Sequence, residues 1–179
     1  DVRDRWLRPH GRILPSRFRL FIEPITMHPA MRVRRFWNID LPDGIDLSPM
    51  RESLLAQRYE TGKNEQTWLR PGAVAATAGE PQPVMEFDLN ALHDAAALPT
   101  EFVVERTVRH DMIVDGVSIW FEAIFDDETV LSTSPLDPIT SWGNRMYRID
   151  QEFAQGQQVK VGVHLRRLVD PETWMVTQL

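Results

Sequence analysis

The chain has 179 residues, of which 42% are hydrophobic and 26% are charged, as in ordinary globular domains. Its 26 acidic and 20 basic residues give a net charge of -6, which argues against a general nucleic-acid-binding role. The sequence has no cysteine, which excludes disulfides, thiol catalysis and cysteine-ligated zinc and fits a cytoplasmic protein. No apolar run approaches the roughly 20 residues that span a bilayer. From the net charge we therefore expect no nucleic acid as a partner, and from the lack of a long apolar run we expect no membrane.

The first segment, "DVRDRWLRPHG", predicts a short helix. Val2 and Trp6 are four residues apart and share one helical face, and Pro9 and Gly11 end the pattern. A helix of two turns is marginal by itself. The chain also begins Asp-Val-Arg, without an initiator methionine. We therefore expect a fragment or processed product, in which residues 1–14 are the tail of an upstream domain.

Residues 17–23 alternate apolar and charged side chains, which is the period of a half-buried strand. The apolar positions are Phe18, Leu20 and Ile22. Pro24 has no backbone N–H, so it predicts either the end of regular pairing or an edge position for this strand.

Residues from about 29 to 75 predict a helical insertion. Pro29 is suited to open one helix, and Ser48-Pro49 is an N-cap followed by proline at the first helical position of another. The run "LRPGAVAATAGEPQP" at its end predicts a loop or extended connector. The segment carries more large apolar residues than a free-standing arm would expose: Trp37, Met50, Leu54, Leu55, Tyr59 and Trp68.

From Val84 onward the sequence predicts short antiparallel strands. Asp115-Gly116, between two apolar runs, is the strongest hairpin signal in the chain. Asp126-Asp127 predicts another turn, and Asp170-Pro171 precedes a last strand from Trp174 to Leu179. Apolar faces are expected at Phe102, Val104 and Val108, at Ile119, Phe121, Ala123 and Phe125, and at Val159, Val161, Val163 and Leu165.

These strands predict a mainly β fold over residues 15–179, either an antiparallel barrel or a barrel-like sandwich, with the insertion as a helical arm. We expect residues 15–25 to pair with the strands after Val84. The shared core should include Phe18, Leu20, Phe121, Phe125 and Val161.

Catalytic and metal-binding motifs are absent from the sequence. The histidines lack the spacing of metal ligands, no serine lies in a G-x-S-x-G setting, and there is no glycine-rich phosphate loop. The five histidines are His10, His28, His93, His110 and His164. We therefore predict no catalytic residue and no metal site in this chain.

One connector has an unusual composition. The segment "STSPLDPITSWGNRMYRI" holds a large aromatic, Trp142, between Ser141 and Gly143. A plain connector prefers small polar residues and turn formers. The tryptophan therefore either packs on the rim of the β-domain or lines a binding site.

This segment resembles the C-terminal barrel of the protein arginine methyltransferases. Ser132-Thr133-Ser134-Pro135 matches the family's first element, and Thr140-Ser141-Trp142 stands where the family has Thr-His-Trp. Ser141 thus replaces a histidine that pairs with an acidic group of the catalytic domain, and Asn144 stands near a common glutamine. Three further segments match in the family's order. They are "RWLRPHGRILPSRFRLFIEPI" at the entry to the barrel, "RFWNIDLPDGIDLSPM" at the opening of the dimerisation arm, and "VMEFDLN" in the strand that returns from it.

The resemblance implies the substrate-binding and dimerisation barrel of an S-adenosylmethionine-dependent methyltransferase. The cofactor site and the paired glutamates would lie upstream, in a Rossmann-like domain, so this chain alone would bind no cofactor. Thr140, Ser141 and Trp142 would contact the methyl acceptor, a protein or a small amine. The arm would dock on the other subunit of a homodimer through Trp37, Met50, Leu54, Tyr59 and Trp68. The alternative is a non-enzymatic β-barrel that binds or dimerises without a catalytic partner domain.

Overall fold

The computed structural model describes residues 6–8, 10–32, 44–46, 49 and 65–179. The expected helix of residues 1–11 lies mostly outside this range. Five of the expected arm residues also lie outside it: Trp37, Met50, Leu54, Leu55 and Tyr59. In the described part of the chain, no helix is long and apolar enough to cross a membrane.

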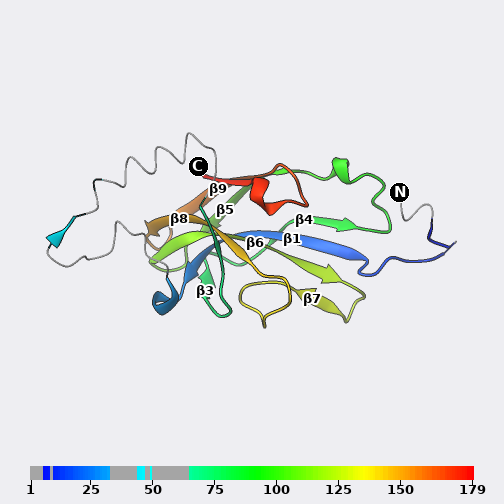
Figure 1. Ribbon diagram of the computed structural model, residues 1–179, viewed down its shortest axis with the longest axis horizontal. Helices are drawn as coiled ribbons and strands as arrows, with labels where there is room; N and C mark the ends of the chain where they lie inside the picture. Colours follow the sequence, from blue (N-terminus) through cyan, green and yellow to red (C-terminus); the bar gives the residue numbers. More distant parts are fainter. Residues whose placement is uncertain (1–5, 9, 33–43, 47–48, 50–64) are drawn as a thin grey trace.

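Two antiparallel sheets form the fold (Figure 1). The larger sheet has the order β2-β8-β6-β1-β3, with β4 also paired to β1 and β7 to β6. Its strands are β1 (Arg17–Met27), β2 (Gln66–Trp68), β3 (Val74–Thr77), β4 (Pro83–Asp88), β6 (Met112–Ile124), β7 (Val130–Ser132) and β8 (Arg145–Phe153). The smaller sheet has the order β10-β9-β5, with β5 (Glu101–Thr107), β9 (Gln158–Leu165) and β10 (Trp174–Gln178). Short 3-10 helices are η1 (Pro29–Met31), η4 (Ala95–Ala97) and η5 (Pro171–Thr173). The mainly β, antiparallel fold is confirmed.

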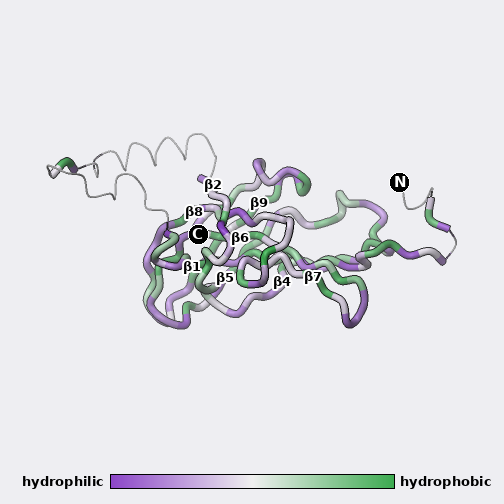
Figure 2. The backbone as a smooth tube through the Cα atoms, turned by 60° about the horizontal axis from the view of Figure 1, so that its bottom comes forward, coloured by the Kyte–Doolittle hydropathy of each residue, from purple (hydrophilic) through white to green (hydrophobic). Residues whose placement is uncertain are grey.

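The main core lies between the two sheets. Val159, Val161, Val163 and Leu165 alternate along β9 as expected, and all four are buried. They pack with residues of the larger sheet such as Ile22, Val117 and Tyr147. Figure 2 shows the alternation that produces this core, as short hydrophobic and hydrophilic bands along the strands.

β1 is a central strand of the larger sheet and continues through Pro24. It pairs with β6 from Arg17 to Ile25, which confirms the pairing expected for residues 15–25. The expectation that Pro24 ends the pairing or marks an edge is wrong. The other side of β1 pairs with β4 up to Phe21 and with β3 from Ile25, so Pro24 lies between these two partners. The missing N–H therefore breaks no ladder hydrogen bond, while the Pro24 carbonyl accepts one from Ala78 N at 2.9 Å.

Asp115-Gly116 is not a hairpin, which corrects the strongest turn prediction. β6 runs through both residues, and its register with β8 shifts between Val114 and Gly116. A Cβ on Gly116 would lie 2.4 Å from the carbonyl oxygen of Tyr147 on β8. The glycine is therefore required for the close approach of two strands. On β8, Asp150 has a φ of 58°, which accommodates the extra residue of the bulge.

A buried ion pair joins the two sheets at β1 and β5. Glu23 is fully buried, and its Oε2 accepts a hydrogen bond from Arg106 Nε of β5 at 2.7 Å. Its Oε1 also accepts from Gln82 N at 3.0 Å. Arg106 interrupts the apolar face of β5 in the sequence because it has this partner across the core.

The sheet takes up part of the range assigned to the insertion. Residues 66–68 form β2, paired with β8, and residues 74–77 form β3, paired with β1. The expected loop over "LRPGAVAATAGEPQP" therefore contains a strand. Residues 29–31, expected to open a helix of the insertion, form the short η1. The insertion is confined to the chain between Arg32 and Glu65.

Candidate functional site

The loop between β7 and β8, residues 133–144, holds the three expected substrate-binding residues. Thr133 fixes its start because the hydroxyl donates to Phe121 O at 2.9 Å and accepts from Phe121 N at 3.0 Å. At the other end, Asn144 Nδ2 donates to Thr133 O at 2.8 Å. Hydrogen bonds therefore tie the start of the loop to β6 and close its base.

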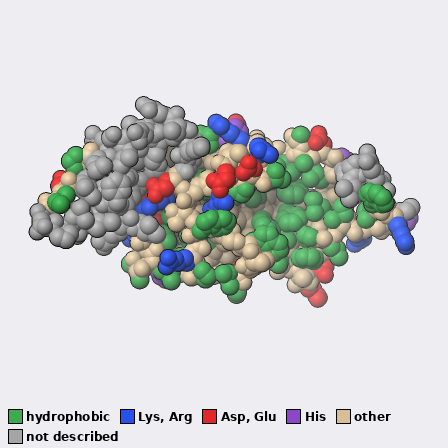
Figure 3. Space-filling view, viewed as in Figure 1, with side chains coloured by type: hydrophobic (Ala, Val, Ile, Leu, Met, Phe, Trp, Pro, Cys, Tyr) green, Lys and Arg blue, Asp and Glu red, His purple; other side chains and the backbone are tan. Residues whose placement is uncertain are grey.

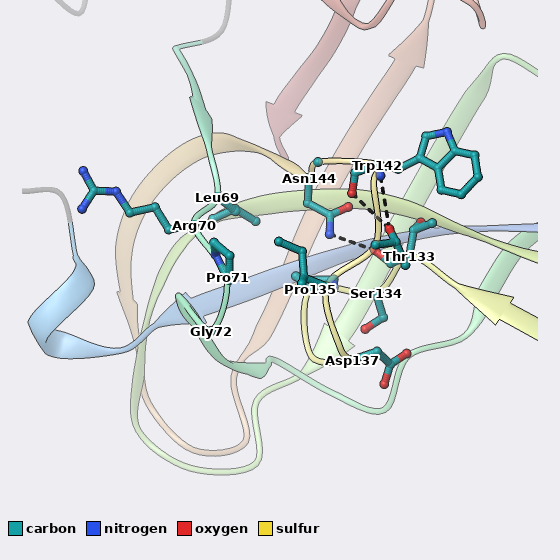
Figure 4. Close-up of a pocket in the computed structure, with 13 residues that line it drawn as sticks. Leu69, Arg70, Pro71, Gly72, Thr133, Ser134, Pro135, Asp137, Trp142 and Asn144 are labelled. Atoms are coloured by element: carbon teal, nitrogen blue, oxygen red, sulfur yellow. Dashed lines mark hydrogen bonds between the residues drawn. The ribbon is translucent and has the colours of Figure 1, made fainter.

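Trp142 packs on the sheet with one edge and leaves the rest of its ring open. Its indole makes a T-shaped contact with Phe121, with ring centroids 5.8 Å apart, and 52% of the residue is exposed. In Figure 4 the indole points away from the cavity on the other side of the loop. Thr140 accepts from Trp142 N at 3.3 Å, which helps to define the tip. The contact with Phe121 shows that Trp142 packs on the rim, and the role of its exposed part in binding stays a prediction.

An aromatic row continues from Trp142 across the end of the larger sheet. Phe121 contacts Phe18 at a centroid distance of 5.6 Å, and Phe18 stacks on Phe87 at 5.7 Å. These three phenylalanines are half-buried, whereas Val161 is fully buried in the main core. Phe125 is half-buried as well, and Leu20 packs against the core from its edge. The expected core therefore divides into a closed part and an open aromatic face.

We call Phe18, Phe87, Phe121 and Trp142 the aromatic face. Figure 3 shows hydrophobic side chains gathered at the end of the larger sheet where β1 and β7 begin and where β4 and β6 finish. The smaller sheet covers the middle of β1 and β6, where Ile22 and Ile119 are buried. The aromatic face is thus the uncovered continuation of the core surface. Large contiguous apolar patches on a protein surface often belong to interaction sites.

A small cavity lies on the opposite side of the loop from the indole. Its volume is about 60 Å³, which suits a few water molecules but no large ligand. It lies between the loop and the turn at residues 69–72, and Pro71, Pro135 and Asn144 are among its walls (Figure 4). Leu69 N donates to Asn144 O at 2.9 Å and links this turn to the loop.

Trp68 supports the loop from β2, which corrects its expected place on the arm. A Cβ on Gly143 would lie 2.8 Å from the Trp68 ring, so the indole packs directly on the glycine backbone. The Arg145 guanidinium lies 4.3 Å from the centroid of the same ring, a cation–π contact. Arg145 Nη1 also donates to Gln66 Oε1 at 2.9 Å and pairs with Glu172. Trp68 is therefore a residue of the sheet, fixed by its neighbours.

The structure brings Thr140, Ser141 and Trp142 together at one loop tip, with Ser141 exposed. Sequence reasoning placed Phe18 and Phe121 in one core but not beside the loop, and it missed Phe87, because strands far apart in the chain carry these residues. It also missed Trp68 and Arg145 as neighbours of the loop. The only trace of this contact in the sequence is Gly143, which has no side chain where the Trp68 ring packs. The sequence does not show that Trp68 is the residue that packs there.

The loop's side chains offer hydroxyl groups, the Asp137 carboxylate, the Asn144 amide and an indole. The described residues contain no cluster of histidine, aspartate or glutamate that could hold a metal ion. Nearby, burial raises the pKa of Tyr147, whose hydroxyl donates to Pro171 O at 3.0 Å. The phenol therefore stays protonated and structural.

Comparison with known proteins identifies the family. Residues 17–171 match the family described as the arginine methyltransferase oligomerization subdomain. This chain belongs to that family. Two relatives of the subdomain are protein arginine N-methyltransferase 6 of Xenopus laevis and of Danio rerio. Each is 28% identical, over 174 and 164 residues, and each alignment covers 89% of this chain. It covers 47% and 46% of those proteins, so the chain spans about half their length.

Other arginine methyltransferase proteins match at lower identity. Histone-arginine methyltransferase CARMER of Drosophila virilis is 26% identical over 148 residues, which are 77% of this chain and 26% of that protein. Among solved structures, PRMT6–SAH superposes with a TM-score of 0.58 at 21% identity, over 93% of this chain and 55% of the other. The Trypanosoma brucei PRMT1 enzyme–prozyme complex with AdoHcy superposes with a TM-score of 0.62 at 15% identity. The match covers 99% of this chain and 60% of the other. At these identities the structures show a shared fold.

Proposed function

We propose that this chain is the substrate-binding and dimerisation half of an S-adenosylmethionine-dependent methyltransferase that modifies a protein or a small amine. Membership of the oligomerization subdomain family supports this proposal. The chain spans about half of its protein arginine N-methyltransferase 6 relatives. The catalytic half would precede it in the intact protein.

The observation that carries the proposal is the aromatic face beside the loop tip. Phe18, Phe87 and Phe121 continue the core surface but are only half-buried. A catalytic domain upstream of residue 17 is the occupant that we propose, because the face lies where β1 enters the sheet. Docking there would bury the phenylalanines and bring Thr140, Ser141 and Trp142 to the edge of a shared pocket.

In this arrangement the exposed face of Trp142 would form one wall of the acceptor site. An indole attracts a guanidinium or ammonium group through a cation–π contact and keeps water away from the reacting methyl group. Ser141 stands where the family has histidine, and its uncharged hydroxyl can donate one hydrogen bond and accept two. We therefore expect Ser141 to contribute little to catalysis unless an upstream acid faces it.

The cofactor would bind outside the described residues. In open α/β sheets, ligands bind at the carboxyl ends of the strands, and the upstream site that we propose is of this kind. Every strand pairing in the described part of this chain is antiparallel, so these residues do not form such a site. The upstream domain would supply both the methyl donor and the acidic residues that position the acceptor.

Substitution of Trp142 by alanine in the full-length protein tests the proposal. We expect turnover to fall about 10- to 100-fold, because an aromatic wall and a cation–π contact contribute about 1–3 kcal/mol. The loss of stability should stay below about 2 kcal/mol, since the ring makes one edge contact and is half exposed. Methyl transfer from labelled S-adenosylmethionine and thermal unfolding are measured on the same preparations.

Leu136→Ala is the matched control, because Leu136 is a partly exposed apolar residue of the same loop outside the aromatic row. It should leave turnover near that of the unmodified protein. A Trp142→Ala protein that loses stability but keeps its activity per folded molecule would show that the tryptophan only packs the rim. Absence of methyl transfer by the unmodified full-length protein would favour the alternative, a non-enzymatic binding or dimerisation module.

A further inference from the structure

The loop that carries Trp142 rejoins the larger sheet beside Trp68. Trp68 is the last residue of β2, and it lies directly opposite Arg145, the first residue of β8, in the antiparallel ladder. The Trp68 ring also contacts Gly143, where an added Cβ would lie 2.8 Å from Cζ3 of the indole. The ring therefore faces the backbone of the residue that directly follows Trp142.

Arg145 holds the Trp68 ring in place. Its guanidinium lies 4.3 Å from the ring centroid. Its Nη1 donates to Gln66 Oε1 at 2.9 Å and pairs with Glu172 of η5. Gln66 lies two residues before Trp68 on the same face of β2, and its Nε2 donates to Pro171 O at 3.4 Å. The guanidinium is thus fixed by β2 and by η5, which limits the movement of the ring that it contacts.

The contact between Trp68 and Gly143 has little to do with the buried core. Trp68 is 60% exposed, and neither cluster of buried residues in the described part of the chain includes it. The backbone of Gly143 is outside the left-handed region, and the three heavy atoms nearest to an added Cβ all belong to the Trp68 ring. The ring therefore restricts where the loop backbone can lie, while the core of the two sheets is complete without it.

We infer that Trp68 and Arg145 are positioning residues for Trp142 and that they set the affinity of the loop for the methyl acceptor. The inference rests on the proposed function, in which the exposed face of Trp142 forms a wall of the acceptor site. Because Gly143 directly follows Trp142, a shift of its backbone carries the indole with it. A displacement of about 1 Å in a group that positions a substrate can lower the rate about 100-fold. The contacts from Arg145 through Trp68 to Gly143 would thus act on the reaction without touching the acceptor.

Steady-state kinetics of the full-length protein test this inference. The acceptor is a glycine-rich peptide with one arginine, or propylamine if the peptide is not methylated. The assay gives kcat and the KM values for the acceptor and for S-adenosylmethionine, and thermal unfolding is measured on the same preparations. A variant that is only partly folded loses kcat and keeps both KM values, whereas a displaced loop raises the acceptor KM.

Trp68→Ala and Arg145→Met each remove one contact of the series. We expect the acceptor KM to rise about tenfold in Trp68→Ala and by a smaller factor in Arg145→Met, in which the ring remains but is less restrained. The KM for S-adenosylmethionine should not change, because the cofactor would bind in the upstream domain. Trp68→Phe keeps a flat ring at this position and should recover most of the acceptor affinity.

Gly143→Ala tests the same contact from the side of the loop. The added methyl group would lie 2.8 Å from the Trp68 ring, so it should force the ring and the loop apart and raise the acceptor KM. In the Trp68→Ala background the methyl group no longer meets the ring. The double variant should therefore match Trp68→Ala alone. Independent, multiplying increases in the acceptor KM would contradict the inference.

Arg109→Met is the matched control for Arg145→Met. Arg109 forms an exposed ion pair with Glu80 at 3.2 Å and lies between β5 and β6, so the same charge is lost outside the contacts of the loop. Its kinetic constants should match those of the unmodified protein.

Two outcomes separate this inference from the proposed function. Acceptor KM values within about twofold of the unmodified value in Trp68→Ala, Arg145→Met and Gly143→Ala overturn the inference, while the methyl transfer that they measure supports the proposed function. Absence of methyl transfer to both acceptors by the unmodified protein overturns the proposed function, and this inference with it.

Discussion

Gly116 and Trp142 show how a residue takes its role from what faces it. Asp-Gly favours a tight turn in isolation, yet here the glycine lies in the middle of β6, where β8 approaches too closely for any side chain. Trp142 is an aromatic in a connector, and its single contact with Phe121 leaves half of it open. In both cases the residue type indicates a local constraint, and the residue that faces it determines whether this constraint is a turn, a close strand contact or a packed ring.

Gly116→Ala should destabilise the chain strongly. The added methyl group would lie 2.4 Å from the Tyr147 carbonyl oxygen, and a backbone atom in the middle of a sheet cannot move aside. We expect a loss of about 3 kcal/mol in the free energy of unfolding, at the upper end of overpacking effects. Urea denaturation followed by circular dichroism measures this value.

Gly72→Ala is the comparison for this substitution. Gly72 has a φ of 67° and no atom within 4 Å of an added Cβ, so only backbone strain applies. Its cost should be about 1 kcal/mol. Equal losses in the two variants would mean that the close approach of β8 does not explain the glycine in β6.

At the scale of elements, β1 joins the parts of the fold. It pairs with β3, β4 and β6 within the larger sheet, and Glu23 on it reaches Arg106 of β5 in the smaller sheet. The sequence predicted the strand but described Pro24 as its limit. Because β4 and β3 pair with different parts of one side of β1, no ladder hydrogen bond needs an N–H at Pro24. Only the assembled sheet shows this gap between the two partner strands.

Removal of one partner of the ion pair between the sheets should be costly. Glu23→Met or Arg106→Met leaves a buried charge without its opposite, and each should lower the free energy of unfolding by about 3–5 kcal/mol. The double variant Glu23→Met with Arg106→Met should recover most of this loss, because no charge then remains buried. Thermal and urea unfolding of the four proteins complete the cycle. Additive losses in the double variant would contradict direct pairing across the core.

At the scale of the whole molecule, the chain is one half of an interacting pair of domains in our proposal. The aromatic face lies near Phe18, at the start of β1, and Asp115 holds the other end of the strand through the Met27 backbone N–H. In our proposal the start of β1 would meet the upstream catalytic domain.

The isolated chain of residues 1–179 should show no micromolar affinity for S-adenosylmethionine. Its described strands pair in antiparallel fashion, whereas this type of cofactor binds at the ends of parallel strands. The full-length protein should bind the cofactor under the same conditions. Isothermal titration calorimetry of both proteins makes the comparison. A micromolar dissociation constant for the isolated chain would show that the cofactor site lies within it.

The sequence by itself determined the fold class, the alternating faces of β1 and β9, and the loop with Thr140, Ser141 and Trp142. These features depend on local periodicity and on a short motif, which neighbouring residues carry. Only the tertiary structure decided that Gly116 lies within a strand, that Trp68 supports the loop, and that Phe18 and Phe121 form an open face. Each of these depends on a partner that is distant in the chain, such as Tyr147 or Gly143. Local propensity favours a turn or an arm at such positions, and the contacts of the assembled sheet override it.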